Sequence, residues 1–390
     1  MEFCLPVPVQ IALDSLTAAG HEAYLVGGCV RDVLRGVSPH DYDITTSARP
    51  EETLSVFSNY RTIETGLRHG TVTVLIDGMP LEITTYRVDG AYADHRRPDE
   101  VHFTSSLRED LARRDFTVNA MAYHPDYGLV DPFLGREDLK RGIIRAVGDP
   151  LKRFSEDALR ILRALRFAAR FDFEIEEKTH EAVFALADTL TMIAPERIRE
   201  ELLGILVADS ALRVMREYAA ILAVIAPKGR WSEAAARLPV KDPVLRLADF
   251  FLSAGEEAKD ALLALRFDNK TVLAVSSVIS LYESEITADR ECICRLLRKV
   301  GIDALRAGFA LRRAHGIDDG VATAMAEKIF DEKIPYTLAM LAIGGGDLAA
   351  LGVPRGPRIG AILEEVYTAV IRGEVENKKE SLLTYAEQYA

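Results

Sequence analysis

The chain contains 390 residues, of which 48% are hydrophobic and 28% are charged, as is usual for a globular protein. It is too long for one compact core, so we expect about two to four domains. Its formal net charge of −12 excludes binding of nucleic acid through bulk charge, and any surface for RNA must therefore be a local basic patch.

Cysteine usage and hydropathy bear on the location of the protein. The four cysteines are scattered, and none belongs to a Cys-x-x-Cys pair. Cys292 and Cys294 are better explained as small buried side chains than as a metal site. The N-terminus lacks the features of a signal peptide, and no apolar run is long enough to cross a membrane. We therefore expect a cytoplasmic protein, with its thiols reduced, that does not contact a membrane.

A glycine pair and two aspartates mark the N-terminal region. The apolar residues 23–26 predict a strand, the pair Gly27-Gly28 follows, and a helix pattern comes next. Residues 41–45 predict a second strand. Because alternate residues of a strand point to the same face, Asp41 and Asp43 are expected to project together.

These residue types suit a phosphate and a cation. Two neighbouring carboxylates repel unless a cation lies between them, and hard oxygen ligands suit Mg²⁺, which also takes phosphate oxygens. Gly28 lets a phosphate approach the backbone, and Arg31 supplies positive charge nearby. Taken alone, the glycine pair fits an ordinary turn equally well, and the two aspartates fit a polar strand end. Their order favours metal-dependent nucleotidyl transfer.

The rest of the first 150 residues predicts a small mixed sheet with helices. Residues 71–76 and 81–86 flank Asp77-Gly78 and predict a hairpin. Glu82, on the second strand of this hairpin, is a candidate third carboxylate. Residues 87–102 are polar and without period, and a loop of this length inside a domain is usually functional or disordered.

From Pro150 onward helical periods dominate, so the predicted fold class is α+β, with the mixed sheet followed by an all-α part. One long helix is expected over residues 155–170, with Ser155 as its N-cap. At about 100° per residue, four charged side chains of this region share an arc of roughly 120°. They are Arg153, Asp157, Arg160 and Arg163.

The arginines of this helix have two interpretations. A solvated arginine face with ordinary pairing is the simpler one. However, the helix carries four arginines directly after a domain boundary of an acidic chain, which favours a site for phosphate and base. These arginines are Arg160, Arg163, Arg166 and Arg170.

Asp157 and Arg160 together could read the edge of a base. Cytosine and adenine both present an amino donor beside a ring-nitrogen acceptor. A carboxylate accepts from the amino group, and a guanidinium donates to the ring nitrogen. Uracil and guanine reverse this pattern and would leave buried groups unpaired, at a cost of about 1–3 kcal/mol each.

Taken together, these residues resemble the ordered motifs of class II tRNA nucleotidyltransferases. This family comprises the bacterial and eukaryotic CCA-adding enzymes, with bacterial poly(A) polymerases as close relatives. The resemblance covers residues 25–198 and extends to the distal segment 343–360. The matching motifs are Leu25-Val26-Gly27-Gly28-x-x-Arg31-Asp32 with Asp41-x-Asp43, Arg113-Arg114-Asp115-Phe116-Thr117-x-Asn119-Ala120, Asp131-Pro132-Phe133-x-Gly135, Glu156-Asp157-x-x-Arg160 and Glu196-Arg197-Ile198.

The resemblance implies a fold and an activity. It implies a polymerase-β-like nucleotidyltransferase head over residues 1–150, a neck that selects the base over 151–208, a helical body over 209–300 and a tRNA-binding tail over 301–390. The family adds C, C and A to the 3′ end of tRNA from CTP and ATP and releases pyrophosphate, with Mg²⁺. Residues 87–102 resemble the flexible loop that helps the switch from C to A. Because this loop is intact, an activity restricted to C addition is disfavoured.

The resemblance also assigns roles to single residues. Asp41 and Asp43 are implied to be the catalytic Mg²⁺ ligands. Asp157 and Arg160 are implied to select the base. The remaining nucleotide-binding residues that it implies are Gly28, Arg31, Arg114, Arg163 and Arg166.

A glycine- and proline-rich segment in the tail has two interpretations as well. Residues 352–360 open a helix and resemble a helix-hairpin-helix loop that offers backbone N–H groups to phosphate. An ordinary connector between helices explains the spacing equally well. Arg295, Arg298, Lys299, Arg306, Arg312 and Arg313 could add to an RNA-binding face, but surface cations are usually only solvated.

Four other functions compete with CCA addition. A poly(A) polymerase or an enzyme that adds only the terminal A would share the motifs of the head. A non-catalytic RNA-binding protein could keep the fold, but retention of both aspartates and all the arginines argues against it. A nucleotidyltransferase for small molecules would not need the long helical part.

Overall fold

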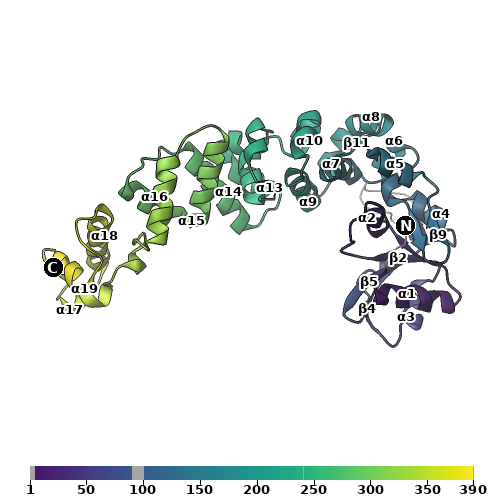
Figure 1. The fold of residues 1–390 in the computed structure, drawn as a ribbon, viewed down its shortest axis with the longest axis horizontal. Coiled ribbons are helices and arrows are strands. Elements are labelled where there is room, and N and C mark those ends of the chain that lie inside the picture. The colour runs from purple at the N-terminus through teal and green to yellow at the C-terminus, as the bar shows by residue number, and fades with distance from the viewer. Residues whose placement is uncertain (1–4, 90–100, 240, 390) are drawn as a thin grey trace. The chain divides into compact units, whose positions relative to one another are not determined.

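A computed structural model describes residues 5–89, 101–239 and 241–389 (Figure 1). The chain divides into two compact units, Met1–Pro227 and Lys228–Ala390. The first unit contains the sheet and the helices that follow it, and the second is helical. This arrangement confirms the predicted α+β class, whereas the finer division into head, neck, body and tail stays a prediction.

The described residues form a mixed seven-stranded sheet with the order β3-β4-β5-β2-β1-β8-β9. Central strand β2 pairs antiparallel with β1 and parallel with β5. Strand β4 alternates as predicted, with Val72, Val74 and Ile76 fully buried. The strands are β1 Ala23–Val26, β2 Asp43–Thr46, β3 Arg61–Ile63, β4 Thr71–Ile76, β5 Met79–Thr85, β8 Ala122–His124 and β9 Gly128–Val130.

Helices of the first unit cover the sheet and extend beyond it (Figure 1). Helices α1 and α3 pack against strands β1 and β4, respectively. The helices of this unit are α1 Val7–Ala18, α2 Gly28–Leu34, α3 Pro50–Val56, α4 Leu107–Ala112, α5 Gly135–Arg141, α6 Pro150–Glu156, α7 Leu159–Phe171, α8 Glu177–Ala185, α9 Pro195–Leu206, α10 Ala211–Glu217 and α11 Ala219–Ile225. Short 3₁₀ helices lie at η1 Leu67–His69, η2 Thr117–Asn119 and η3 Ala187–Met192.

Two expectations about the sheet domain need correction. Strand β2 begins at Asp43, so Asp41 lies before the strand rather than on it. The predicted loop over residues 87–102 is not a loop at its ends, because β6 (Arg87–Asp89) pairs antiparallel with β7 (Val101–Phe103). Residues 90–100 lie outside the described part of the chain.

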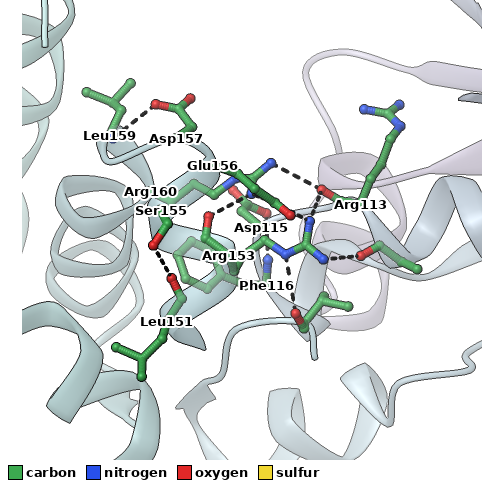
Figure 2. Close-up of polar contacts among 12 residues, drawn as sticks. Arg113, Asp115, Phe116, Leu151, Arg153, Ser155, Glu156, Asp157, Leu159 and Arg160 are labelled. Atoms are coloured by element: carbon green, nitrogen blue, oxygen red, sulfur yellow. Dashed lines mark hydrogen bonds and ion pairs between the residues drawn. The ribbon is translucent and has the colours of Figure 1, made fainter. Parts of the chain in front are cut away.

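The single helix predicted over residues 155–170 is wrong. Asp149 accepts a hydrogen bond from the Leu151 N–H and caps α6, which starts at Pro150. Ser155 is not an N-cap, because its hydroxyl donates back to the Leu151 carbonyl at 2.7 Å. Asp157 then adopts an extended conformation and ends α6, and its carboxylate accepts from the Leu159 N–H at the start of α7 (Figure 2). The arc argument for one continuous helix face therefore fails.

A short parallel pair ties the sheet domain to the helices that follow it. Strand β10 (Ile143–Ile144) pairs with β11 (Glu174–Ile175), which directly follows α7. Helix α7 buries one complete face, and α9 packs along it. These contacts fix α7 beside the 3₁₀ helix η2 within the same unit, as the edge-to-face contact between Phe116 and Phe167 shows.

The second unit is helical, and an apolar core cluster joins its helices from Leu281 onward. Leu297, Leu305, Val366 and Tyr367 are among its fully buried members. Its helices are α12 Pro243–Phe250, α13 Ala258–Ala264, α14 Asn269–Glu283, α15 Arg290–Ala314, α16 Gly320–Asp331, α17 Gly345–Ala350, α18 Pro357–Arg372 and α19 Lys379–Glu387, with η4 Glu233–Arg237, η5 Leu252–Glu257 and η6 Leu338–Met340. In the described parts of the chain, no helix is long and apolar enough to span a membrane.

Several arginines suggested for an RNA face are engaged within this unit. Arg298 pairs with Glu364, and Arg306 pairs with Glu327. Arg312 is buried against Asp319 and donates to the carbonyls of Tyr282 and Ser284 near the C-terminus of α14. Arg312 therefore stabilises the helix packing and is not available to RNA.

Gly135 provides a test of how α5 holds η2 in place. A Cβ atom at Gly135 would lie 2.1 Å from the Thr117 carbonyl oxygen. We expect Gly135→Ala to lower the free energy of unfolding by about 1–3 kcal/mol, because the backbone must move to relieve the overlap. Chemical denaturation measures this change. Gly360→Ala, with no atom within 4 Å of the added Cβ, is the control, and equal stability of both variants would contradict the packing argument.

Candidate active site

One pocket of ≈ 490 Å³ gathers most of the predicted site residues. It lies where α2, η2, α7 and α9 meet. Its charged lining consists of eight arginines and three aspartates, so a strongly positive site exists in an acidic chain. The charged lining residues are Arg31, Arg113, Arg114, Arg160, Arg163, Arg166, Arg170, Arg197, Asp43, Asp115 and Asp157.

The structure thus brings together every predicted site residue except one. Gly28, Arg31, Asp43 and Arg114 come from the sheet domain, and the others come from α7 and the residues just before it. Asp41 is exposed and, among the described residues, does not belong to the pocket lining.

The glycine pair permits close packing at one end of the pocket. Gly27 has a φ of 76°, and a Cβ there would lie 3.2 Å from Nη1 of Arg114. A Cβ at Gly28 would lie 3.6 Å from Nη2 of Arg31. Residues without side chains at these two positions therefore leave both guanidinium groups open to the pocket.

Asp43 lies near two other carboxylates and one arginine. It stands opposite Glu82 in the register of the parallel strands β2 and β5. Burial raises the pKa of Asp43 to about 6, and Glu82 and Asp41 add to this rise while Arg114 opposes it. In the described residues, no group of three or more His, Cys, Asp or Glu side chains could hold a metal ion by itself. The oxygen donors fit Mg²⁺ only in its usual form, in which substrate phosphates complete the coordination.

Asp110 holds the two neighbouring arginines Arg113 and Arg114. It is fully buried and accepts from Nε and Nη2 of Arg113 at 2.9 and 2.8 Å, and from Nη2 of Arg114 at 3.1 Å. Burial acts to raise the pKa of Asp110, but the two guanidinium groups lower it below its ordinary value. Nε of Arg114 is buried and has no partner among the described residues.

Acidic partners also fix the arginines of α7. Asp115 accepts from Nε of Arg163 at 2.8 Å and forms an ion pair with Nη2 at 2.7 Å. Burial opposes ionisation of Asp115, but Arg163, Asn119 and the Phe116 N–H lower its pKa to about 2. Arg166 donates to Glu201 of α9 at 2.5 Å.

Asp157 and Arg160 do not pair with each other, although they are three residues apart in the sequence. Asp157 accepts from Nη2 and Nη1 of Arg197 at 2.8 and 3.3 Å. Arg160 donates to Glu156 at 2.7 Å and to the Arg113 carbonyl at 3.2 Å (Figure 2). Both side chains still line the pocket. Each is therefore held by its own partners beside the same space.

Arg153 reinforces this arrangement. It donates to the carbonyls of Ala112 and Arg113 at 2.7 and 3.1 Å, and to Glu156 at 2.8 Å (Figure 2). The carbonyl of Arg113 thus accepts from both Arg153 and Arg160. This network fixes the end of α6 to the end of α4.

Comparisons with known proteins agree with this geometry. Family models described as Poly A polymerase head domain, RNA and SrmB-binding site of polymerase A, and tRNA nucleotidyltransferase domain 2 match residues 23–145, 172–227 and 246–386. A CCA-adding enzyme of Leuconostoc mesenteroides is 37% identical, with 98% of this chain and 96% of the relative covered. One from Streptococcus thermophilus is 36% identical, with 99% and 97% covered. The chain belongs to the family of CCA-adding enzymes.

A solved structure supports the same family. The crystal structure of the Bacillus stearothermophilus CCA-adding enzyme in complex with CTP is 32% identical in sequence and has a TM-score of 0.81. It covers 98% of both chains. The predicted family of class II tRNA nucleotidyltransferases is therefore confirmed.

The sequence alone does not reveal several residues that hold this pocket together. Arg197 and Asn119 lie in the matching motifs, but no role for them follows from the sequence, and none follows for Asp110 or Glu201. Arg197 contacts a residue 40 positions away, and Glu201 one 35 positions away. Only the Arg113-Arg114-Asp115 motif and the four-residue spacing of Asp115 and Asn119 gave a local signal.

Arg197 gives a test of how Asp157 is positioned. Arg197→Met keeps much of the side chain but leaves Asp157 with only the Leu159 N–H of the partners described above, so its carboxylate can rotate. We expect the ratio of kcat/KM for CTP to that for UTP to fall about tenfold, the equivalent of one lost hydrogen bond to a charged group.

The matched control is Arg199→Met on the same helix, because Arg199 does not line the pocket among the described residues. Arg197→Lys should fall between wild type and Arg197→Met. An unchanged ratio in Arg197→Met would show that Asp157 does not need this partner.

Proposed function

We propose that this chain adds C, C and A to the 3′ end of tRNA without a nucleic-acid template, using CTP and ATP and releasing pyrophosphate. The observation that carries the proposal is the pocket that combines Asp43, a row of arginines, and Asp157 with Arg160. The full-length similarity to CCA-adding enzymes supports the same reaction. We infer a cytoplasmic location, where tRNA and both nucleotides are found.

In this reaction the 3′-hydroxyl oxygen of the RNA forms a bond to the α-phosphorus of the nucleotide and loses its proton to the surrounding water. The bond from that phosphorus to the bridging oxygen breaks, and pyrophosphate leaves with the electron pair. Mg²⁺ bound by Asp41, Asp43 and the phosphates would supply positive charge for the attacking and leaving oxygens. Glu82 is a further candidate ligand because of its register with Asp43.

The arginines would bind the triphosphate and hold it in line. Arg31 and Arg114 stand beside the glycine pair, where a phosphate could approach the backbone. Arg163 and Arg166 are fixed by Asp115 and Glu201 before any nucleotide arrives. This preorganisation lowers the entropy that binding must overcome.

Asp157 and Arg160 would choose the base. Asp157 accepts from the exocyclic amino group of cytosine or adenine, and Arg160 donates to the adjacent ring nitrogen. Their separate anchors, Arg197 for the carboxylate and Glu156 for the guanidinium, keep this pattern in place. Uracil and guanine would place their carbonyl oxygen against the Asp157 carboxylate and their ring N–H against the Arg160 guanidinium.

Poly(A) synthesis or addition of A alone is the alternative within the family, because the head matches a model described as Poly A polymerase head domain. A direct assay separates the three. We expect tRNA that ends at the discriminator base to accept two C residues from CTP and then one A from ATP, and tRNA that ends in CC to accept only A. Asp41→Ala and Asp43→Ala should each abolish incorporation while tRNA binding persists.

The outcomes of this assay are distinct. Long A tracts would favour poly(A) synthesis. Incorporation on CC ends only would favour an A-adding enzyme. Loss of tRNA binding together with activity would assign the aspartates a structural role.

Reversing the base-reading pattern tests the selection mechanism. In Asp157→Asn with Arg160→Gln, the first amide can donate to a carbonyl and the second can accept from a ring N–H, as uracil and guanine require. We expect the preference for CTP over UTP to fall by at least about tenfold. The base-edge argument would be contradicted if the variant kept its preference for CTP over UTP. It would also be contradicted if activity fell equally with all four nucleotides.

A further inference from the structure

Asn119 joins two charged residues of the pocket. Its Oδ1 accepts from Nη1 of Arg31 at 2.6 Å, and its Nδ2 donates to Oδ1 of Asp115 at 3.0 Å. We propose that Asn119 is a positioning residue that fixes Arg31 and couples it, through Asp115, to Arg163 of α7. The inference rests on the proposed function, in which Arg31 contacts the triphosphate.

The chemistry of an amide explains why asparagine occupies this position. A cation lies on one side of it and an anion on the other. The side chain must accept from the first and donate to the second, and a primary amide does both. The flanking charges also decide its orientation, because the flipped amide would point its NH₂ group at Arg31 and its oxygen at Asp115. Asn119 is 7% exposed, so water cannot easily replace either contact.

Arg31 depends on this contact for its direction. It is 5% exposed, and its Nε donates to Asp32 at 2.9 Å. Its guanidinium carbon lies 4.8 Å from the ring centre of Phe171. The described residues provide no acceptor for Nη2, the atom nearest to Gly28, so this is the N–H group left for a phosphate oxygen. Asn119 is the contact from η2 that keeps the guanidinium turned in this way.

The other end of the relay is equally constrained. Oδ1 of Asp115 also accepts from the Phe116 N–H at 2.8 Å, and Oδ2 accepts from Arg163. Every oxygen of this carboxylate therefore has a donor. The chain of contacts therefore runs from the Arg31 cation through the neutral Asn119 amide and the Asp115 anion to the Arg163 cation. A shift of Arg163 must move Asp115, and a shift of Asp115 must move the amide that holds Arg31.

The experiment measures steady-state addition of CMP to tRNA that ends at the discriminator base, with Mg²⁺ and CTP. We expect Asn119→Leu, which loses both contacts, to raise the KM for CTP about tenfold, the equivalent of one hydrogen bond to a charged group, and to change kcat by less than about threefold. Arg31→Met should raise this KM at least as much. In the double variant, the KM should match that of Arg31→Met, because Asn119 acts through Arg31.

A second, smaller variant tests the relay if Asn119→Leu does not fold. Asn119→Ala also loses both contacts, but it leaves the pairing of Asp115 with Arg163 untouched. We expect this variant to raise the KM for CTP in the wild-type background and to raise it much less in the Arg31→Met background. Thr117→Val is the control from the same 3₁₀ helix, because it removes a buried hydrogen bond to Asp138 without touching Arg31. It should lower stability and leave the KM unchanged.

The possible results separate the two claims. An unchanged KM in Arg31→Met would overturn the phosphate-binding role of Arg31 and with it this part of the proposed function. A raised KM in Arg31→Met together with an unchanged KM in Asn119→Leu would overturn the role of Asn119 alone. The role of Asn119 would also be overturned if the effects of Arg31→Met and of either Asn119 variant simply multiplied when the two changes were combined.

Discussion

Eight guanidinium groups around one pocket repel each other, and the rest of the site depends on how this repulsion is offset. Six carboxylates pair with seven of these arginines. Four of the six do not belong to the pocket lining among the described residues, so they pair with the arginines from outside the pocket. The face toward the pocket therefore stays positive while the surrounding protein is close to balanced. The pairing carboxylates are Asp32, Asp110, Asp115, Glu156, Asp157 and Glu201.

Arg170, the eighth, is treated differently. Its guanidinium carbon lies 5.5 Å from the ring centre of Phe171. The guanidinium groups of Arg31 and Arg35 contact the same ring. Burial and the nearby charges of Arg31 and Arg170 lower the pKa of Arg35, although Asp32 opposes this effect. An aromatic face attracts cations without neutralising them. The pocket thus gains positive charge at this edge at the expense of stability, which is a common property of binding sites.

Local sequence was sufficient for the elements whose signals are local. The alternation of β4 and its hairpin turn predicted the sheet strands, and the glycine pair predicted the turn into α2. The error at α6 was also local, because Asp149 and Pro150 are a stronger helix start than Ser155, and an aspartate such as Asp157 can end a helix by capping the next one. By contrast, the contact of Arg31 with Asn119 joins residues 88 positions apart. Helix and strand periodicity in the sequence cannot predict such a pair, because the two residues meet only through the packing of η2 against α2.

The end of the pocket at Asp43 has the opposite charge. Asp43 stands opposite Glu82 in the strand register, and burial raises the pKa of Asp43, with repulsion from Glu82 and Asp41 adding to this rise. One end of the site therefore has an excess of negative charge and the rest has an excess of positive charge. A free triphosphate would satisfy the arginines but repel the carboxylates, and a free cation would do the reverse. Under the proposed function, only a nucleotide bound to its cation matches both ends, so the charge distribution favours the metal–nucleotide complex over either component alone.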